Sequence, residues 1–264
     1  MSSDFSTLRL ERDGGVARLT LDRPEAANAL DLTMGRELMQ AAIQLDEDPT
    51  VRAVLLTAEG KMFCAGGDLG AMQAAGEGAA AYIKELASYL HLAISRFARM
   101  RAPIVAAVNG TAAGAGFSMV CATDLAIAAD HAKLTMAYTG AGLSPDGSSS
   151  YFLPRIIGQR RTFELMLTNR VLTAAEALDW GLLNEVVPAD ELMATAEKRV
   201  AQLASGPTNA HAVVKRLLAT SATESLETQM EHETRGIAEC ARTADGREGI
   251  TAFLEKRKPS FEGA

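Results

Sequence analysis

The chain has 264 residues, of which 48% are hydrophobic and 22% are charged, so it can bury a substantial core. Its formal net charge of −7 argues against nucleic acid as a partner, because phosphate backbones are bound by clustered lysine and arginine. Three scattered cysteines with no CxxC pair exclude a disulfide framework and a structural zinc site of that type.

The beginning of the chain, MSSDFSTLRLERDGG, lacks the apolar segment of a secretory signal. No apolar run in the sequence reaches the length that a membrane-spanning helix needs. We therefore expect a cytoplasmic protein without a membrane partner.

Strand and helix patterns alternate in the first 100 residues. Residues 16–21 (VARLTL) and the apolar stretch that begins at Val51 are typical of strands, and the second is too apolar to face water. Between them we predict a helix from about residue 32 to residue 46, with Asp31 as its N-cap. Apolar residues at helical spacing predict a further helix over residues 79–100.

The next segments continue this rhythm. PIVAAVNG and LAIAAD are typical of buried strands in a parallel sheet, and GAGFSMVCATD between them is typical of a short apolar helix. Strands that alternate with helices imply parallel crossovers, so we predict an α/β fold.

The pattern changes after residue 155, where helices dominate. A weak last strand is predicted at residues 186–187, and the spacing of Thr173 and Glu176 predicts a capping box. Helices are predicted at residues 159–168, 173–180, 190–205, 209–220 and 224–243. We divide the chain into a core, residues 1–200, and a helical C-terminal extension, residues 201–264.

The last of these helices has an apolar face that needs a partner. Leu226, Met230 and Ile237 mark this face. A terminal helical arm with such a face is often buried against another subunit, so we predict a homo-oligomer.

Two glycine-rich turns, FCAGGDL (residues 63–69) and NGTAAGAGFSM (residues 109–119), each follow a predicted strand. Turns of this type leave backbone N–H groups without partners, and two such groups that converge on one oxygen form an oxyanion hole. Taken singly, such a turn more often only permits close packing. The second turn lacks the Lys-Ser/Thr pair of a P-loop and the distant acid of a dinucleotide site, so neither nucleotide chemistry is favoured.

Six motifs occur in an order that resembles the crotonase superfamily, also called the enoyl-CoA hydratase/isomerase family. They are RPEAANAL, FCAGGDL, PIVAAVNGTAAGAG, GLSPDG, DWGLLNEVV and GITAFLEKRKPSF. The resemblance covers essentially the whole chain. It implies a ClpP-like spiral of ββα units with a helical C-terminal extension, an acyl-CoA substrate, no separate cofactor and no metal. It also implies a homotrimer or a dimer of trimers.

The same resemblance assigns residues to the site. The backbone N–H groups of Gly67 and Ala115 would form the oxyanion hole that stabilises a thioester enolate. Two loops would bind the CoA moiety, through Glu25, Ala26, Ala27, Ala65, Gly66, Asp68 and Leu69. For Asp68, a role as a capping or bracing acid is the more common one.

At two positions the chain departs from the family pattern. Where hydratases carry two glutamates that activate water, this chain has Ser118 and Tyr138. Ordinary hydroxyl groups hold their protons too tightly to act as general bases at neutral pH, so simple hydration is not expected. Tyr138 is predicted to line the acyl pocket or donate a hydrogen bond, unless it only fills the core.

Asp146 stands where two branches of the family carry a reactive aspartate. In isomerases the aspartate moves a proton between carbons, whereas in 4-halobenzoyl-CoA dehalogenases it attacks the ring and a histidine, matched here by His91, acts as base. Leu143 and residues 151–153 predict apolar surroundings for the carboxylate. An aspartate before Gly147 also favours a turn, and His91 at the edge of an apolar stripe is as often structural as catalytic.

Three hypotheses follow for function. The first is an enoyl-CoA or ring-epoxide isomerase that uses Asp146 for proton transfer. The second is a dehalogenase-like substitution with Asp146 as nucleophile. The third is a non-catalytic acyl-CoA-binding protein that has kept the fold.

Overall fold

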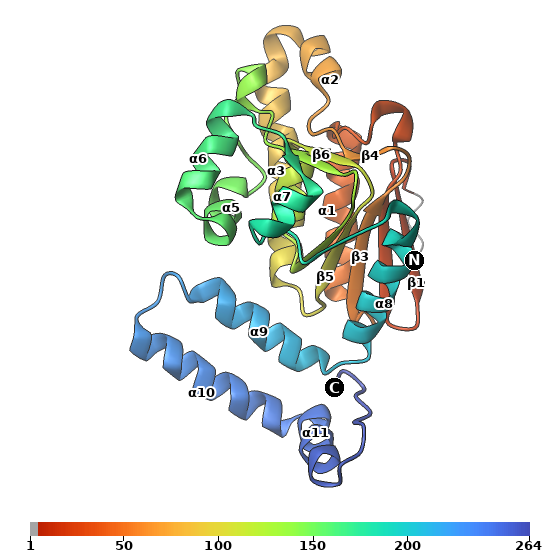
Figure 1. Ribbon diagram of the computed structural model, residues 1–264, viewed down its shortest axis with the longest axis vertical. Helices are drawn as coiled ribbons and strands as arrows, with labels where there is room; N and C mark the ends of the chain where they lie inside the picture. Colours follow the sequence, from red (N-terminus) through yellow and green to blue (C-terminus); the bar gives the residue numbers. More distant parts are fainter. Residues whose placement is uncertain (1–4) are drawn as a thin grey trace.

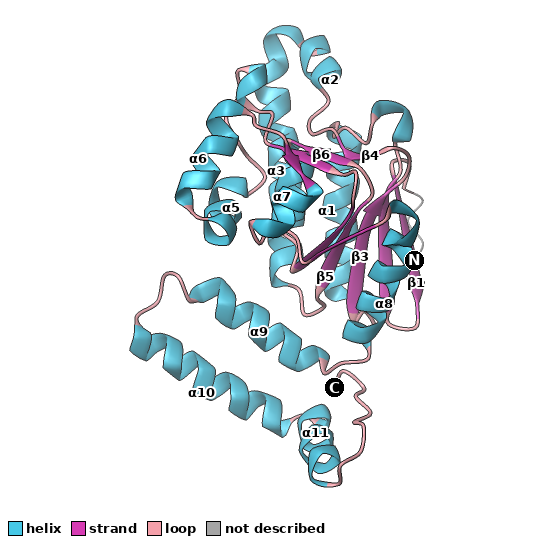
Figure 2. Cartoon of the chain, in the orientation of Figure 1, coloured by secondary structure: helices cyan, strands magenta, loops and turns pink. Residues whose placement is uncertain are grey.

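A computed structural model describes residues 5–264 and has two sheets. The larger sheet has six strands in the order β1-β2-β3-β5-β7-β10, and all its pairings are parallel except the β1–β2 hairpin (Figure 2). The strands are β1 (Leu8–Asp13), β2 (Val16–Leu21), β3 (Ala53–Ala58), β5 (Ile104–Val108), β7 (Leu125–Ala129) and β10 (Glu185–Val187).

The smaller sheet repeats the connectivity of the larger one. Each of β3, β5 and β7 is followed by a short strand of the smaller sheet, in which the order is β4-β6-β8-β9. These strands are β4 (Met62–Cys64), β6 (Thr111–Ala113), β8 (Lys133–Thr135) and β9 (Leu172–Thr173). Pairs of strands followed by helices make the predicted spiral of ββα units.

Helices cover both faces of the larger sheet. Residues at alternate positions of β3 pack against α8 (Leu192–Ala204), and those between them pack into the core formed with α1 (Leu32–Glu47) and α3 (Ala79–Arg99). Every residue of β3 and β5 is buried, as an apolar strand between two helical layers requires.

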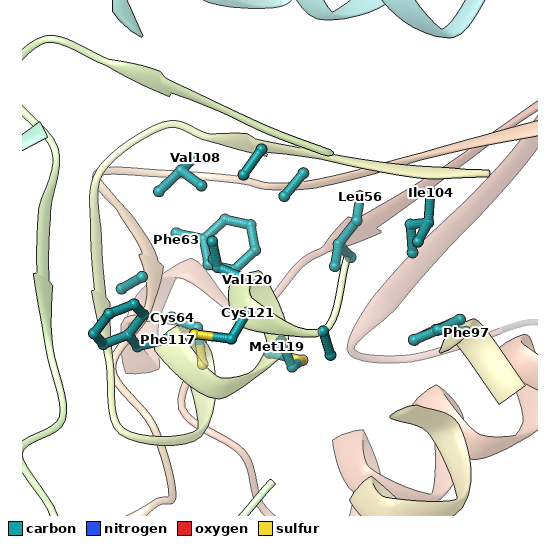
Figure 3. Close-up of a cluster of buried hydrophobic side chains, with 14 of the residues drawn as sticks. Leu56, Phe63, Cys64, Phe97, Ile104, Val108, Phe117, Met119, Val120 and Cys121 are labelled. Carbon is teal, nitrogen blue, oxygen red and sulfur yellow. The ribbon is translucent and has the colours of Figure 1, made fainter. Parts of the chain in front are cut away.

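The short helix α4 (Ala115–Cys121) lies inside this core. All seven of its residues are buried, and Phe117 packs with Phe63 in the apolar cluster shown in Figure 3. A helix buried on all sides cannot shift without opening a cavity, so its first residue is held in place by packing.

The C-terminal helices form an arm that extends away from the sheets (Figure 1). It consists of α9 (Thr208–Thr220), α10 (Leu226–Arg242) and α11 (Ala244–Leu254). Lys215 of α9 fixes the arm to the body, because its buried ammonium group donates to Phe97 O at 2.9 Å and pairs with Asp124 at 2.8 Å. The division at residue 200 falls inside α8 and stays a prediction.

Several elements were not expected from the sequence, namely β1, β4, β6, β8, β9, α2 (Leu69–Ala74), α5 (Ser149–Ile157) and α11. α5 begins with serines and contains Pro154, a composition that masks a helix. The other helices lie where they were predicted, including α6 (Gln159–Thr168) and the short α7 (Ala174–Asp179) with its capping box. Within residues 5–264, no helix combines the length and the apolar character that crossing a membrane needs.

We predict that Asn28→Ala destabilises the fold. Asn28 is fully buried with φ of 53°, and its side chain accepts from Arg23 N–H and donates to Glu59 O and Met62 O. Removal leaves these three backbone groups unpaired, which should lower the free energy of unfolding by about 3 kcal/mol or more. Urea denaturation measures the change.

Asn109→Ala is the matched control. The amide of Asn109 donates a single hydrogen bond, to Gly60 O at 2.9 Å, so we expect a loss of about 1 kcal/mol. If the two variants lose the same free energy of unfolding, the three buried hydrogen bonds of Asn28 contribute no more to stability than the single bond of Asn109.

Candidate active site

A cavity of about 300 Å³ lies between the two glycine turns and α3. Its apolar wall includes Ile83, Leu86 and Leu90 from α3, of which Ile83 is half-buried. Seven of the site residues expected from the sequence line it as well: Ala65, Gly66, Gly67, Leu69, Ala115, Tyr138 and Asp146. We call this space the reaction cavity.

The first glycine turn presents the N–H group of Gly67. Leu30 N donates to Gly66 O at 2.7 Å and Asp68 N donates to Leu30 O at 2.8 Å, in an isolated parallel bridge. In such a bridge the hydrogen bonds to Leu30 are made by the residues before and after Gly67. The N–H of Gly67 itself points away from Leu30. Within the described chain this N–H has no hydrogen-bond partner.

The second turn leads directly into α4 and presents the N–H group of Ala115. Ala115 is the first residue of the helix, so its N–H has no partner inside the helix. Gly114 before it has φ of 50°, and Gly66 of the first turn has φ of 98°. A Cβ atom on Gly66 would lie 3.0 Å from Ala113 O and 3.4 Å from Ala115 N, so the two turns touch and require glycine there.

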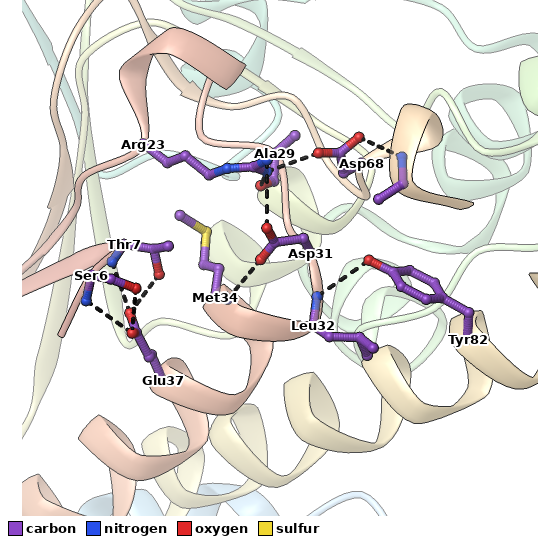
Figure 4. Close-up of polar contacts among 11 residues, drawn as sticks. Ser6, Thr7, Arg23, Ala29, Asp31, Leu32, Met34, Glu37, Asp68 and Tyr82 are labelled. Atoms are coloured by element: carbon purple, nitrogen blue, oxygen red, sulfur yellow. Dashed lines mark hydrogen bonds and ion pairs between the residues drawn. The ribbon is translucent and has the colours of Figure 1, made fainter. Parts of the chain in front are cut away.

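Arg23 braces the first turn from behind, as Figure 4 shows. Its guanidinium group donates to Asp68 at 2.8 Å and to Ala29 O at 2.9 Å, and it lies 3.4 Å from Asp31. Asp68 also accepts from Ala71 N–H as the N-cap of α2, and this bond together with Arg23 lowers the pKa of the Asp68 carboxyl group. Asp68 thus caps and braces the loop and does not line the reaction cavity.

The two loops that were expected to bind CoA lie next to each other. Glu25 and Ala26 belong to a 3-10 turn, and Ala65 N donates to Ala27 O at 3.0 Å. Arg23, which holds both loops, was not expected from the sequence because its two acidic partners are 8 and 45 positions away. That these loops bind CoA stays a prediction.

Asp146 meets both positions at which the hydratase glutamates are missing. Tyr138 donates its hydroxyl hydrogen to Asp146 Oδ1 at 2.7 Å, and Ser118 Oγ lies 3.0 Å from the Tyr138 oxygen. Burial raises the pKa of Tyr138, and the nearby Asp146 carboxylate raises it further. The phenol therefore keeps its proton and acts as a permanent donor to the carboxylate.

The surroundings of Asp146 are less apolar than the sequence indicated. Of the flanking residues expected to surround it, Leu143 lines the reaction cavity, whereas Leu153 is buried in the core and Tyr151 is exposed. The Asp146 side chain is 32% exposed.

His91 lies on the other side of Asp146 from the reaction cavity. Its Nε2 atom is 3.7 Å from Asp146 Oδ2 and accepts the Gly147 N–H at 3.2 Å. The ring does not line the reaction cavity but borders a larger groove of about 1120 Å³, which we call the outer cavity.

Ser118 is small because the turn that carries Asp146 packs directly on it. Ser118 is fully buried, and a Cβ atom built on Gly147 would lie 2.8 Å from the Ser118 Cβ. Its hydroxyl oxygen is 3.0 Å from Asp146 O and 3.2 Å from Gly114 O. A longer side chain at position 118 has no space unless this turn moves.

Comparison with known proteins fits this geometry. The family model described as enoyl-CoA hydratase/isomerase matches residues 11–264. The chain belongs to this family. Its α/β spiral with a helical C-terminal region is the crotonase fold, which it shares with a solved enoyl-CoA hydratase from Polaromonas sp. JS666 at a TM-score of 0.92. The two are 34% identical, and the match covers 97% of this chain and 99% of that one.

Two curated relatives carry different activities in their names. A 1,2-epoxyphenylacetyl-CoA isomerase from Escherichia coli K12 is 37% identical over 94% of this chain and 95% of its own length. A 4-chlorobenzoyl coenzyme A dehalogenase from Arthrobacter sp. is also 37% identical, over 87% of this chain and 84% of its own. Family membership therefore shows an acyl-CoA enzyme without deciding among hydratase, isomerase and dehalogenase activity.

We predict that Ser118→Glu does not create a hydratase. The glutamate would be forced into the space of the Asp146 turn and its charge would be buried, so the free energy of unfolding should fall by about 3 kcal/mol or more. Urea denaturation measures this loss, and the absorbance of a 2-enoyl-CoA measures hydration.

Ser88→Glu, at an exposed position of α3, is the control and should change stability by less than about 0.5 kcal/mol. A Ser118→Glu protein with normal stability that hydrates 2-enoyl-CoA would contradict the packing argument.

Proposed function

We propose that this family member is an enoyl-CoA or ring-epoxide isomerase in which Asp146 transfers the proton. The observation that carries the proposal is the position of a carboxylate, held by Tyr138, on the wall of the cavity that the Gly67 and Ala115 N–H groups also line. A base and an anion-stabilising pair in one cavity are the two groups that a proton shift next to a thioester needs.

The reaction follows from these groups. The thioester oxygen accepts the N–H groups of Gly67 and Ala115, and Asp146 removes a proton from the carbon chain while negative charge moves onto that oxygen as an enolate. Return of the proton from Asp146 to another carbon completes the shift of the double bond. No atom is gained or lost, so the CoA thioester of the substrate suffices and no cofactor or metal takes part.

The alternative with direct support is substitution on an aroyl-CoA. The 3.7 Å distance between His91 Nε2 and Asp146 Oδ2 favours it, as does the similarity to the dehalogenase. Asp146 would displace halide from the ring to form an ester, and His91 would activate the water that hydrolyses it. Tyr138 weighs against this reading, because a tryptophan is expected at its position in that branch.

We further propose that the protein is a cytoplasmic homotrimer or dimer of trimers. Leu226, Met230 and Ile237 on α10 are 54–72% exposed, which leaves the apolar face of the arm uncovered in a single chain. α11 adds Phe253, which is 83% exposed.

Asp146→Asn should abolish isomerisation. With a 3-enoyl-CoA as substrate, the wild-type protein is expected to produce the conjugated 2-enoyl thioester, followed by its absorbance. Loss of the proton-transferring carboxylate should lower kcat by about 10³-fold, while CoA-ester binding persists because the amide keeps the size of the side chain. Binding is measured by calorimetry.

Asp130→Asn, at an exposed position outside both cavities, is the control and should keep the wild-type rate. Full activity in Asp146→Asn would refute the proposal. If the wild-type protein is inactive on 3-enoyl-CoA, mass spectrometry after turnover of 4-chlorobenzoyl-CoA tests the alternative, which requires a covalent adduct on Asp146. Binding without either reaction would support a non-catalytic acyl-CoA-binding protein.

Replacing Met230 and Ile237 together by aspartate should weaken the assembly. Light scattering of the wild-type protein is expected to give three or six chains, and the charged variant should dissociate at low concentration because apolar contact area is replaced by desolvated charge. Glu233→Gln, an exposed change on the same helix, is the control. A wild-type protein that is monomeric at all concentrations would exclude the proposed assembly.

A further inference from the structure

Asp146 forms part of the wall between two cavities. It lines both the reaction cavity and the outer cavity, whereas His91 lines the outer cavity alone. The two side chains are neighbours across this wall, with 3.7 Å between His91 Nε2 and Asp146 Oδ2. A proton on Asp146 thus has two possible directions of travel, toward substrate carbon on one side and toward His91 on the other.

Tyr138 makes the two oxygens of Asp146 unequal. Its hydroxyl hydrogen is donated to Oδ1 at 2.7 Å, and the phenol does not give up this proton because burial raises its pKa. Oδ1 therefore already accepts one hydrogen bond, which favours Oδ2 as the oxygen that takes the proton from the substrate. Oδ2 is the oxygen that His91 faces.

His91 can accept this proton once its Nε2 atom changes partners. In the structure Nε2 accepts the Gly147 N–H at 3.2 Å, so the ring hydrogen is on Nδ1 and the single lone pair of Nε2 is engaged until this bond opens. The side chain is 52% exposed, so its position adjusts by a fraction of an ångström without repacking the core. An imidazole that receives a proton on one nitrogen releases the other to solvent.

We propose that His91 exchanges the proton held on Asp146 with solvent through the outer cavity during isomerisation. The Gly147 N–H first releases Nε2. The Oδ2–H bond then breaks as a bond from this hydrogen to His91 Nε2 forms, and the Nδ1 proton leaves to water. A solvent proton returns by the reverse route before Asp146 delivers it to carbon. This inference rests on the proposed isomerase function and gives His91 a role that needs no covalent intermediate.

Isomerisation in deuterium oxide tests the proposal. The 3-enoyl-CoA is converted only to a small extent, and mass spectrometry gives the deuterium content of the 2-enoyl-CoA product per turnover. The wild-type product should contain deuterium, and His91→Gln should lower this content by about tenfold, because the exchange partner of Asp146 is removed. The label reports the rate of exchange on Asp146 relative to the rate at which the proton returns to carbon, so a mere loss of active protein would not lower it.

His131→Gln is the matched control, because His131 also pairs with an aspartate, Asp130 at 3.5 Å, but lies outside both cavities. Its product should carry the wild-type deuterium content. If His91→Gln does not fold, His91→Ala in the presence of imidazole replaces it, since added imidazole should restore the label at this half-exposed position.

The outcomes separate the two proposals. Isomerisation that does not depend on Asp146 would overturn the proposed function itself. Asp146-dependent isomerisation in which His91→Gln keeps the wild-type label would overturn only the exchange route. Loss of turnover in His91→Gln as severe as in Asp146→Asn would also overturn it, because His91 would then act in the chemistry itself.

Discussion

The site depends on one backbone contact, that between Gly66 and the turn from Ala113 to Ala115. A side chain on Gly66 would collide with this turn, and both Gly66 and Gly114 adopt positive φ. The contact brings two unpaired N–H groups to one cavity wall, and their orientation is held on one side by the bridge to Leu30 and on the other by the buried helix α4. The surrounding core supplies the rigidity that such preorganised donors need.

A second constraint ties the position of Asp146 to the size of residue 118. The turn that carries Asp146 occupies the space beside Ser118, and Tyr138 fills the other position at which hydratases carry an acid. The space that a glutamate at position 118 would need is thus taken by this turn. Under the proposed function, the absence of hydratase chemistry is a matter of packing as much as of chemical groups.

Much of the fold could be predicted because apolar periodicity marks long buried elements, as in α3 and α6. The short strands of the smaller sheet carry too few residues to show a period, and α5 is hidden by its serines and Pro154. At the site, motif resemblance identified Gly67, Ala115 and Asp146. It did not reveal Arg23, or that His91 borders the outer cavity and not the reaction cavity, because those depend on distances between residues far apart in sequence.

Asp124 connects the C-terminal arm to the larger sheet. One oxygen of Asp124 accepts both the Ile104 N–H at the start of β5 and the ammonium group of Lys215 in α9. β5 leads through β6 into the turn at Gly114. The arm is thus held by a hydrogen bond and an ion pair to the start of the strand from which the chain runs on, through β6, to the turn at Gly114, so a displacement of the arm would act on the start of β5.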